Sequence, residues 1–195
     1  MRVLLVHAHP CPESFNTAIR DLVARTLAGA GHEVRHADLY ADGFDPVMSA
    51  GERRGYHTEG ANEVPVAREL ERLKWAEALV FVYPTWWYGL PAMLKGWLDR
   101  ALVPHATFAM PEPGNHIRPR LTNIRKMAVI STCGSPWLWM KIVGDPGRRT
   151  LTRGVRAICH PACRTLWLAH YSIDSSTDGS RKAFLAKVER RMARF

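Results

Sequence analysis

Long apolar runs are missing from this sequence. None of its hydrophobic stretches reaches the roughly 18 residues that a membrane-spanning helix requires. The opening segment MRVLLVHAHP is interrupted by histidine and proline too early for a secretory signal. The protein is therefore expected to be cytoplasmic and not to span a membrane.

Cysteine is scarce, with four residues among 195. Cys11, Cys133, Cys159 and Cys163 form no paired framework of the kind found in secreted domains, which agrees with a reducing compartment. Cys159 and Cys163 flank His160 in the run CHPAC, but this spacing matches no strong zinc pattern. No metal site is predicted, and ordinary packing is expected for these thiols.

Acidic residues are outnumbered, since 18 Asp and Glu face 27 Lys and Arg and leave a formal net charge of +9. Arg149, Arg153 and Arg156 recur at helical spacing and would share one face. Such a face is usually solvated, and attraction of anionic ligands is the alternative interpretation. No nucleic-acid partner is predicted, because aromatic platforms among the cations and a known docking motif are both missing.

The composition that remains is that of a globular protein. Hydrophobic residues make up 47% and charged residues 23%, both of which are usual for folded domains. A chain of 195 residues can bury a substantial core without a second domain. We therefore expect a single domain over residues 1–195.

Apolar runs and amphipathic stretches alternate along the chain. Strands are predicted at the short apolar runs, namely Arg2–Val6, around Val34, Ala78–Tyr83, Lys126–Thr132 and Arg164–Tyr171. Helices are predicted between and after them, namely from Ser14 to about Ala30, near Val66–Ala76, after Pro91, around Thr150–Ile158, and in a last segment capped near Thr177 or Asp178. Residues 41–63 and 104–123 are interpreted as long excursions.

This alternation indicates a parallel sheet with right-handed crossovers and helices on both faces. The first strand-to-helix loop, HAHPCPESFNT, contains neither GxGxxG nor GxxxxGK[ST], which argues against a Rossmann dinucleotide domain and a P-loop enzyme. The prediction is an α/β, flavodoxin-like, doubly wound sheet of five parallel strands in the order 2-1-3-4-5. In that fold, ligands bind beyond the carboxyl ends of the strands, between the first and the third.

The loop after the first strand has two interpretations. His9, Ser14, Asn16 and Thr17 surround the start of the following helix. Unpaired N–H groups and the helix dipole favour a phosphate at such a place. Capping of the helix by Ser14 is the alternative, and in that case Asn16 has no special role.

The loops after the third and fourth strands also carry unusual residues. Trp86, Trp87 and Tyr88 follow one another at a strand end, where large aromatic side chains are normally avoided. They would suit either a flat ligand or a plug beneath a neighbouring loop or subunit. The small residues of STCGSP would let backbone N–H groups approach the polar edge of a ring, or form a simple turn.

Three of these motifs carry a family resemblance. HPCPESFN, YPTWWYGLPAMLKGWLDR and STCGS resemble the motifs of the NAD(P)H dehydrogenase (quinone) family, and LYADGFDPVMS and HYSIDSSTDGSRKAFL follow its pattern in order. That family comprises flavoproteins, including quinone reductases and the ancillary subunit of a glutathione-gated potassium efflux system. The resemblance implies a homodimer with two active sites at the interface, each holding FAD or FMN. FAD is favoured, because ESFN resembles the FAD-binding quinone reductases.

The resemblance also assigns residues by position. At the flavin phosphates it places His9, Ser14, Phe15, Asn16 and Thr17. Along the isoalloxazine it places Pro84, Thr85, Trp86, Trp87 and Tyr88. At the pyrimidine edge it places Thr132, Cys133, Gly134 and Ser135, and facing the substrate it places Trp87 and Phe108.

One part of the family pattern is absent. The quinone reductases carry TTGG and, shortly after it, a tyrosine and a histidine that manage proton and charge changes on the flavin. Here Cys133 replaces a glycine, and Trp139 and Asp145 hold the nearest positions. Tyr88, Trp139 and Asp145 are therefore the candidate catalytic residues, and the family's proton donor is not carried over.

The expected function is a flavin-dependent NAD(P)H:quinone oxidoreductase. Two-electron hydride transfer would follow a ping-pong mechanism, in which NAD(P)H and a quinone or similar planar acceptor use one slot in turn. The alternative is a flavin-binding regulatory subunit of a membrane transporter of the potassium efflux type, whose acidic surface the basic chain would meet. A one-electron flavodoxin fits less well, because those carriers are acidic. The sequence shows no residue that would distinguish NADH from NADPH.

Overall fold

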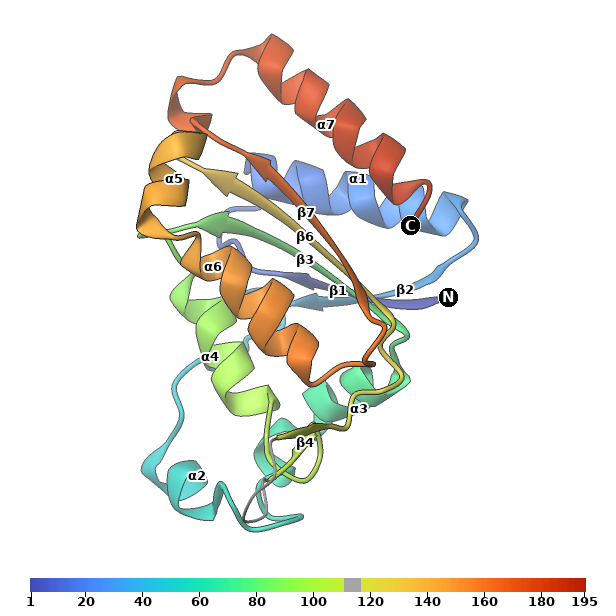
Figure 1. Ribbon diagram of the computed structural model, residues 1–195, viewed down its shortest axis with the longest axis vertical. Helices are drawn as coiled ribbons and strands as arrows, with labels where there is room; N and C mark the ends of the chain where they lie inside the picture. The colour runs from blue at the N-terminus through green and yellow to red at the C-terminus, as the bar shows by residue number, and fades with distance from the viewer. Residues whose placement is uncertain (111–116) are drawn as a thin grey trace.

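A parallel sheet in the strand order β2-β1-β3-β6-β7 forms the centre of the computed structural model, which describes residues 1–110 and 117–195 (Figure 1). Each strand runs parallel to its neighbours. The strands are β1 (Arg2–His7), β2 (Glu33–Asp38), β3 (Ala78–Thr85), β6 (Lys126–Cys133) and β7 (Arg164–His170). This arrangement confirms the predicted flavodoxin-like order of five strands.

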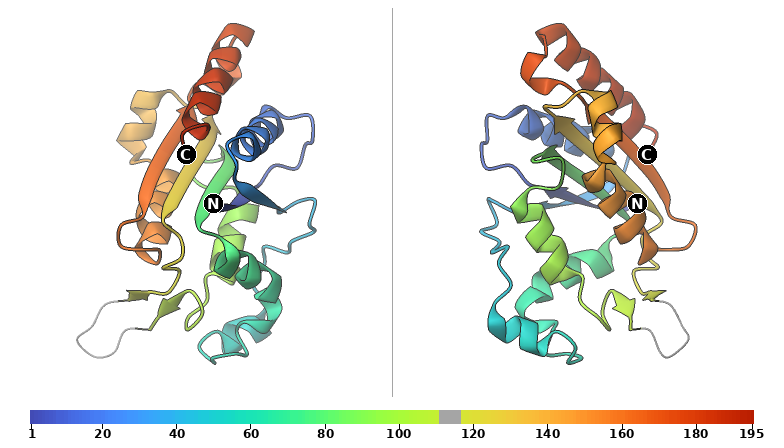
Figure 2. Two further views of the ribbon diagram at one scale, coloured as in Figure 1. Left: turned by 90° about the vertical axis from the view of Figure 1, so that its right-hand side faces the viewer. Right: turned by 60° about the vertical axis from the view of Figure 1, so that its left-hand side comes forward.

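Helices cover both faces of this sheet (Figures 1 and 2). On one face, α1 (Phe15–Gly29) and α7 (Asp178–Met192) bury Ile19, Val23, Leu27, Phe184, Val188 and Met192 against the strands. On the other face lie α3 (Ala67–Trp75), α4 (Ala92–Ala101), α6 (Pro146–Arg149) and the π-helical turn η2 (Thr150–Val155). Successive strand residues alternate between these two cores, as the period of a β-strand requires.

The ends of α1 follow from local chemistry. Ser14 is the N-cap, and its hydroxyl accepts the Thr17 N–H at 3.1 Å. The chain leaves the helix through Gly31, which adopts a left-handed φ of +80° that costs glycine little. The predicted cap and stop of this helix are therefore confirmed.

The strand β3 runs two residues further than predicted, to Thr85. Pro84 pairs with Thr132 and Thr85 with Cys133 on β6. On the other side β1 ends at His7, opposite Val82. Beyond Val82, therefore, β3 has only β6 as a neighbour, and a proline is tolerated where a strand has become an edge.

The first excursion, residues 41–63, crosses α4 in close contact with it. A Cβ on Gly96 would lie 2.2 Å from the Pro46 carbonyl oxygen, so only glycine lets the segment cross here. Arg100 then holds the excursion, because it donates to the Asp45 carbonyl and to Glu52 of α2 (Ala50–Gly55). The second excursion contains the short antiparallel strands β4 (Phe108–Ala109) and β5 (Arg118–Pro119). The turns η1 (Val64–Val66) and η3 (Ile173–Ser175) complete the elements described.

Between β6 and β7, one helix was not predicted from the sequence and another begins earlier than predicted. The helix α5 (Trp137–Val143) lacks an amphipathic pattern, because Trp137, Leu138 and Ile142 are all exposed. The helix predicted around Thr150–Ile158 begins instead at Pro146 and passes into η2. Along the described ranges, no helix has the length and apolar character needed to cross a membrane.

Candidate functional site

The loops after β1, β3 and β6 meet at the carboxyl edge of the sheet, as the strand order predicts. A buried hydrogen bond joins two of them, since the Asn16 amide donates to Thr132 Oγ1 at 2.7 Å. The end of β3 is joined to β6 by the hydroxyls of Thr85 and Ser131, 2.9 Å apart. The three loops therefore form one connected site.

The Asn16 side chain makes a contact within the chain that its sequence position does not reveal. The sequence assigns its side chain to a phosphate, but the amide nitrogen is directed to Thr132 and the residue is only 4% exposed. Its Oδ1 is buried without a partner among the described residues. Asn16 thus fastens the start of α1 to the end of β6.

The first loop borders an open hollow of about 450 Å³, lined by residues that include His7, His9, Thr17, Arg20, Asp38 and Tyr40. Ser14 and Thr17 are tied together through their hydroxyls at 3.0 Å, and the Cys11 N–H donates to His9 Nδ1 at 3.0 Å. The N–H groups of Phe15 and Asn16, in the first turn, have no acceptor within the helix. The loop therefore presents N–H donors and a positive helix end next to the hollow.

Beside this hollow lies a charged cluster that sequence reasoning missed. His7 Nδ1 and Arg20 Nη1 both contact Asp38 Oδ2, at 3.1 and 2.6 Å. Burial lowers the pKa of His7, against the opposing effect of Asp38. Burial alone would raise the pKa of Asp38, but the Ala41 N–H, His7 and Arg20 hold it below its usual value.

The protonation of His7 follows from this geometry. An ionised Asp38 only accepts hydrogen bonds, so His7 Nδ1 carries the proton and Nε2 is an acceptor. Nε2 is buried and has no partner among the residues described. No sequence pattern marks this charged cluster, because His7 ends an otherwise apolar strand and a histidine there is most simply interpreted as a strand end.

The aromatic residues after β3 occupy a strained turn. The Gly89 N–H donates to the Trp86 carbonyl at 3.0 Å, and both central residues have left-handed φ angles, +47° for Trp87 and +64° for Tyr88. Residues other than glycine and asparagine are uncommon in that region. Trp87 is 93% exposed, and Trp86 packs near His9 with ring centroids 6.0 Å apart. Exposed aromatic side chains held by a strained backbone are typical of functional sites.

Two candidate catalytic residues are in direct contact. The Trp139 indole Nε1 donates to the Tyr88 hydroxyl at 3.1 Å. This bond ties the exposed face of α5 to the strained turn 86–89, since Trp139 is itself 47% exposed. The two side chains therefore form a single aromatic wall beside the edge of the sheet.

Asp145 has different surroundings. It is 4% exposed, has a left-handed φ of +50°, and pairs through Oδ2 with Lys141 and with Arg148 at 3.7 Å. Burial, followed by the Asp145 charge, raises the pKa of the buried Tyr83 hydroxyl. Asp145 therefore lies on the covered side of α5, whereas Trp139 lies on the exposed side.

The small-residue loop after β6 is closely packed. A Cβ on Gly134 would lie 2.4 Å from Asp174 Oδ2, and the Ser172 N–H donates to the Ser135 carbonyl at 3.2 Å. Burial raises the pKa of the Cys133 thiol, which is only 3% exposed. Gly134 is exposed and Cys133 is not, so the surface that this loop presents at residues 133–134 is mainly backbone.

The remaining candidates divide by position. Pro84, Thr85 and Phe15 lie with the loops at the carboxyl edge, but Phe108 does not. Phe108 is in β4. Figure 1 shows β4 near the end of α4 that is remote from α5. The Phe108 side chain packs against the hydrophobic core. A single chain therefore does not bring Phe108 to the other candidates.

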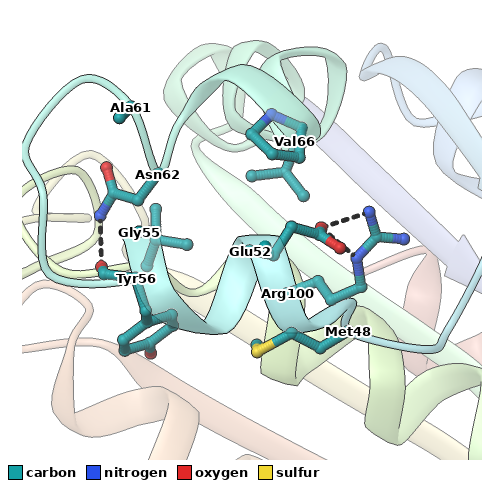
Figure 3. Close-up of a pocket in the computed structure, with 11 residues that line it drawn as sticks. Met48, Glu52, Gly55, Tyr56, Ala61, Asn62, Val66 and Arg100 are labelled. Atoms are coloured by element: carbon teal, nitrogen blue, oxygen red, sulfur yellow. Dashed lines mark hydrogen bonds and ion pairs between the residues drawn. The ribbon is translucent and has the colours of Figure 1, made fainter.

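A second cavity, of about 200 Å³, lies away from this edge (Figure 3). It is bounded by α2, η1 and the end of α4, with the ion pair between Glu52 and Arg100, 2.5 Å long, in one wall. Asn62 lines it and donates to the Tyr56 and Pro104 carbonyls. None of the sequence-predicted site residues lines this cavity. Within the described ranges no group of three or more His, Cys, Asp or Glu side chains is arranged to hold a metal ion.

Known proteins resemble this chain over nearly its whole length. A family model described as "Flavodoxin-like fold" matches residues 1–194. NAD(P)H dehydrogenase [quinone] 1 from Rattus norvegicus is 31% identical over 150 residues, which cover 69% of this chain and 54% of the rat protein. The match thus spans about half the length of such curated relatives.

Solved structures give the same result. NAD(P)H:quinone oxidoreductase from Methanothermobacter marburgensis superposes with a TM-score of 0.83 and 26% identity, covering 99% of this chain and 98% of that one. An FMN-dependent NADH-azoreductase from Bacillus anthracis superposes with a TM-score of 0.79, covering 99% and 98%, and at 17% identity shows the fold alone. With the family match over residues 1–194, these comparisons show that the chain belongs to the flavodoxin-like fold family that includes the NAD(P)H dehydrogenases (quinone).

Proposed function

We propose that this protein is a flavin-dependent NAD(P)H:quinone oxidoreductase in which residues 1–195 form one flavin-binding domain. The observation that carries the proposal is the strained turn that displays Trp87 and Tyr88 beside the backbone-lined loop 132–135. An aromatic wall next to exposed backbone suits a planar ring with a polar edge. The names of the curated and solved relatives support the same activity.

The residues present fit a flavin. The start of α1, with the N–H groups of Phe15 and Asn16, would hold the phosphate next to the hollow of about 450 Å³. Backbone donors of residues 133–135 would face the pyrimidine edge, where negative charge is stabilised. When bound, the flavin supplies a ring that accepts a hydride and passes two electrons on.

The chain's own residues would organise the reaction. Trp87 and Tyr88 would form one wall of a slot that NAD(P)H and a quinone occupy in turn, which predicts ping-pong kinetics. Trp139 would hold Tyr88 in place through the hydrogen bond of 3.1 Å. Asp145 is proposed as a positioning residue, because it is buried below α5 and pairs with Lys141.

The identity of the flavin is open to direct measurement. The motif ESFN favours FAD, whereas the flavin-bearing fold neighbour from Bacillus anthracis is FMN-dependent. Release of the cofactor by heat and determination of its mass distinguishes the two. Either flavin is consistent with the proposed chemistry, because both carry the same isoalloxazine ring.

We also propose that the active form is a homodimer. The helix α5 exposes Trp137, Leu138 and Ile142 by 55%, 63% and 67%, next to the exposed Trp87. Contiguous apolar surface of this kind marks an interface. A second copy is the proposed occupant, because Phe108 lies far from its own site and only another chain can bring that residue to the slot.

The function is tested with the purified protein and no partner. We expect a yellow protein that reduces a soluble quinone with NADH or NADPH, with parallel lines in double-reciprocal plots. A folded sample that stays colourless and binds neither FAD nor FMN in a titration would contradict the proposal. Bound flavin with negligible turnover would favour the regulatory subunit instead.

The dimer is tested separately by sedimentation. The wild-type protein should sediment as a dimer at micromolar concentration, and Ile142→Lys should shift it toward monomer, because an unpaired charge is costly in an apolar interface. Lys187→Glu on α7 is the control and should sediment like wild type. A wild-type monomer with full activity would contradict the dimer.

A further inference from the structure

The structure also bears on which nicotinamide nucleotide this protein uses. Residues 137–156 hold five cations and one carboxylate, namely Lys141, Arg148, Arg149, Arg153 and Arg156 against Asp145. In the sequence, helical spacing alone places Arg149, Arg153 and Arg156 on one face. In the structure they are not equivalent, since Arg156 is occupied by the Cys163 and Pro161 carbonyls.

The segment that carries the arginines touches the site directly. A Cβ on Gly147 would lie 3.3 Å from the Gly89 carbonyl carbon, so α6 packs against the strained turn. Arg148 and Arg149 follow immediately. The Arg149 guanidinium lies over Gly144, 3.4 Å from the position of a Cβ there. Both arginines therefore follow directly on the residue that packs against the turn 86–89, and Arg149 also contacts the end of α5.

The guanidinium groups of Arg148 and Arg149 make no close ion pair among the described residues. Arg148 has only a 3.7 Å contact with Asp145 and is 44% exposed, and Arg149 is exposed. Three other cations near the site differ, because each is paired with a carboxylate at 2.7 Å or less: Arg20 with Asp21 and Asp38, Lys95 with Asp99, and Lys141 with Asp145.

A carboxylate of η3 lies beside the loop after β6. Asp174 lies beside Gly134, where its Oδ2 is 2.4 Å from the position of a Cβ. An anionic group bound above the slot would therefore be repelled from η3 and attracted to α6.

We infer that Arg148 and Arg149 bind the phosphates of the reductant and make NADPH the preferred nucleotide. This inference rests on the proposed function. NADPH differs from NADH by a 2′-phosphate monoester, which carries more negative charge than a diester and offers three acceptor oxygens. Guanidinium groups match such oxygens in two-pronged geometry. The nicotinamide would lie along Trp87 and Tyr88, and the phosphates would extend over α6.

Calorimetric titration with NADP⁺ and NAD⁺ tests the inference without turnover. The purified holoprotein should bind NADP⁺ more tightly, and this preference should weaken at high salt. Arg148→Ala with Arg149→Ala should weaken NADP⁺ binding about tenfold and NAD⁺ binding less, since each exposed arginine contact is worth a few-fold. The ratio of kcat/KM for NADPH and NADH should shift in the same direction.

The controls distinguish an effect of the arginines on α6 from an effect of the protein's net positive charge. Arg190→Ala with Arg191→Ala removes two cations from α7 and should leave the NADP⁺ to NAD⁺ ratio unchanged. Equal affinities in the wild type, or a ratio that survives the Arg148 and Arg149 substitutions, would overturn the inference. If quinone reduction persists in that case, the proposed function stands and only the nucleotide preference fails.

Discussion

Trp139 donates from its indole nitrogen to the hydroxyl of Tyr88 at 3.1 Å, and so joins α5 to the turn that follows β3. Both residues occupy positions that the sequence marks as candidate catalytic residues. Tyr88 is held in a left-handed conformation with a φ of +64°. The hydrogen bond therefore stabilises a backbone that its own residue type disfavours.

Trp139→Phe removes this bond and keeps an aromatic ring. Because a neutral hydrogen bond contributes about 0.5–1.5 kcal/mol, kcat/KM for the quinone should fall about three- to tenfold. Tyr88→Phe should have a similar effect, and the double variant should be no worse than either single one. Trp167→Phe is the control, because it removes a comparable donation from an indole nitrogen to the hydroxyl of Tyr171 at 3.3 Å. An unchanged kcat/KM in Trp139→Phe would show that the bond does not position the wall.

Asn16→Ala tests the tie between α1 and β6. The sequence interpretation predicts little effect on the apo form, but the structure predicts a loss of about 1–3 kcal/mol in the free energy of unfolding, since the buried Thr132 hydroxyl loses its donor. Urea unfolding of the protein without flavin measures this free energy. Thr132→Val and the double variant complete a cycle, which should show coupling. Additive effects would mean that the two side chains act independently.

The buried His7 predicts a pH dependence of stability. Its folded pKa lies below the unfolded value of 6.5 because of burial. The unfolded chain therefore binds more protons, and stability is lost as the pH falls below about 6.5, by up to ~1.4 kcal/mol per pH unit. The lowered pKa of Asp38 acts in the same direction only at more acidic pH.

His7→Asn keeps a donor to Asp38 and cannot titrate. Its free energy of unfolding should decline less than that of the wild type between pH 7 and pH 5. His32 and His36, whose pKa values burial also lowers, remain in the variant, so the difference isolates His7. The exposed His57→Asn serves as the control. Parallel wild-type and His7→Asn curves would contradict the neutral, buried imidazole.

Gly147→Ala tests the contact between α6 and the strained turn. The added Cβ would lie 3.3 Å from the Gly89 carbonyl carbon and 3.4 Å from the Tyr83 hydroxyl, so one of them must shift. We expect a loss of about 1–2 kcal/mol in stability and reduced quinone turnover.

Gly154→Ala is the matched control for this prediction. A Cβ there meets nothing within 4 Å, and alanine is favoured over glycine in helical backbone by about 0.5–1 kcal/mol. Stability should therefore be unchanged or raised, with normal turnover. If both alanine variants behave alike, the contact with Gly89 does not position the turn.

The sheet could be predicted from the sequence because β1, β3 and β6 are continuous apolar runs. The strand order followed from the absence of other phosphate-binding loops. The helix α5 could not be predicted, because helix prediction relies on an apolar face, whereas α5 exposes its apolar side chains.

The site was predictable in its place but not in its contacts. That Asn16 reaches Thr132, 116 residues along the chain, depends on tertiary packing. His7 was missed because its partner Asp38 lies on a neighbouring strand. Phe108 was assigned by resemblance alone, and nothing in the sequence indicates on which side of α4 its strand lies.

The strained turn 86–89 has a consequence for protein engineering. Left-handed backbone at Trp87 and Tyr88 costs about 1–3 kcal/mol per residue and would be relieved by glycine. A selection for heat resistance alone would therefore favour replacement of the aromatic residues that form the wall. Thermostable variants found without an activity screen should accumulate changes at these two positions, and such a library would trade catalysis for stability.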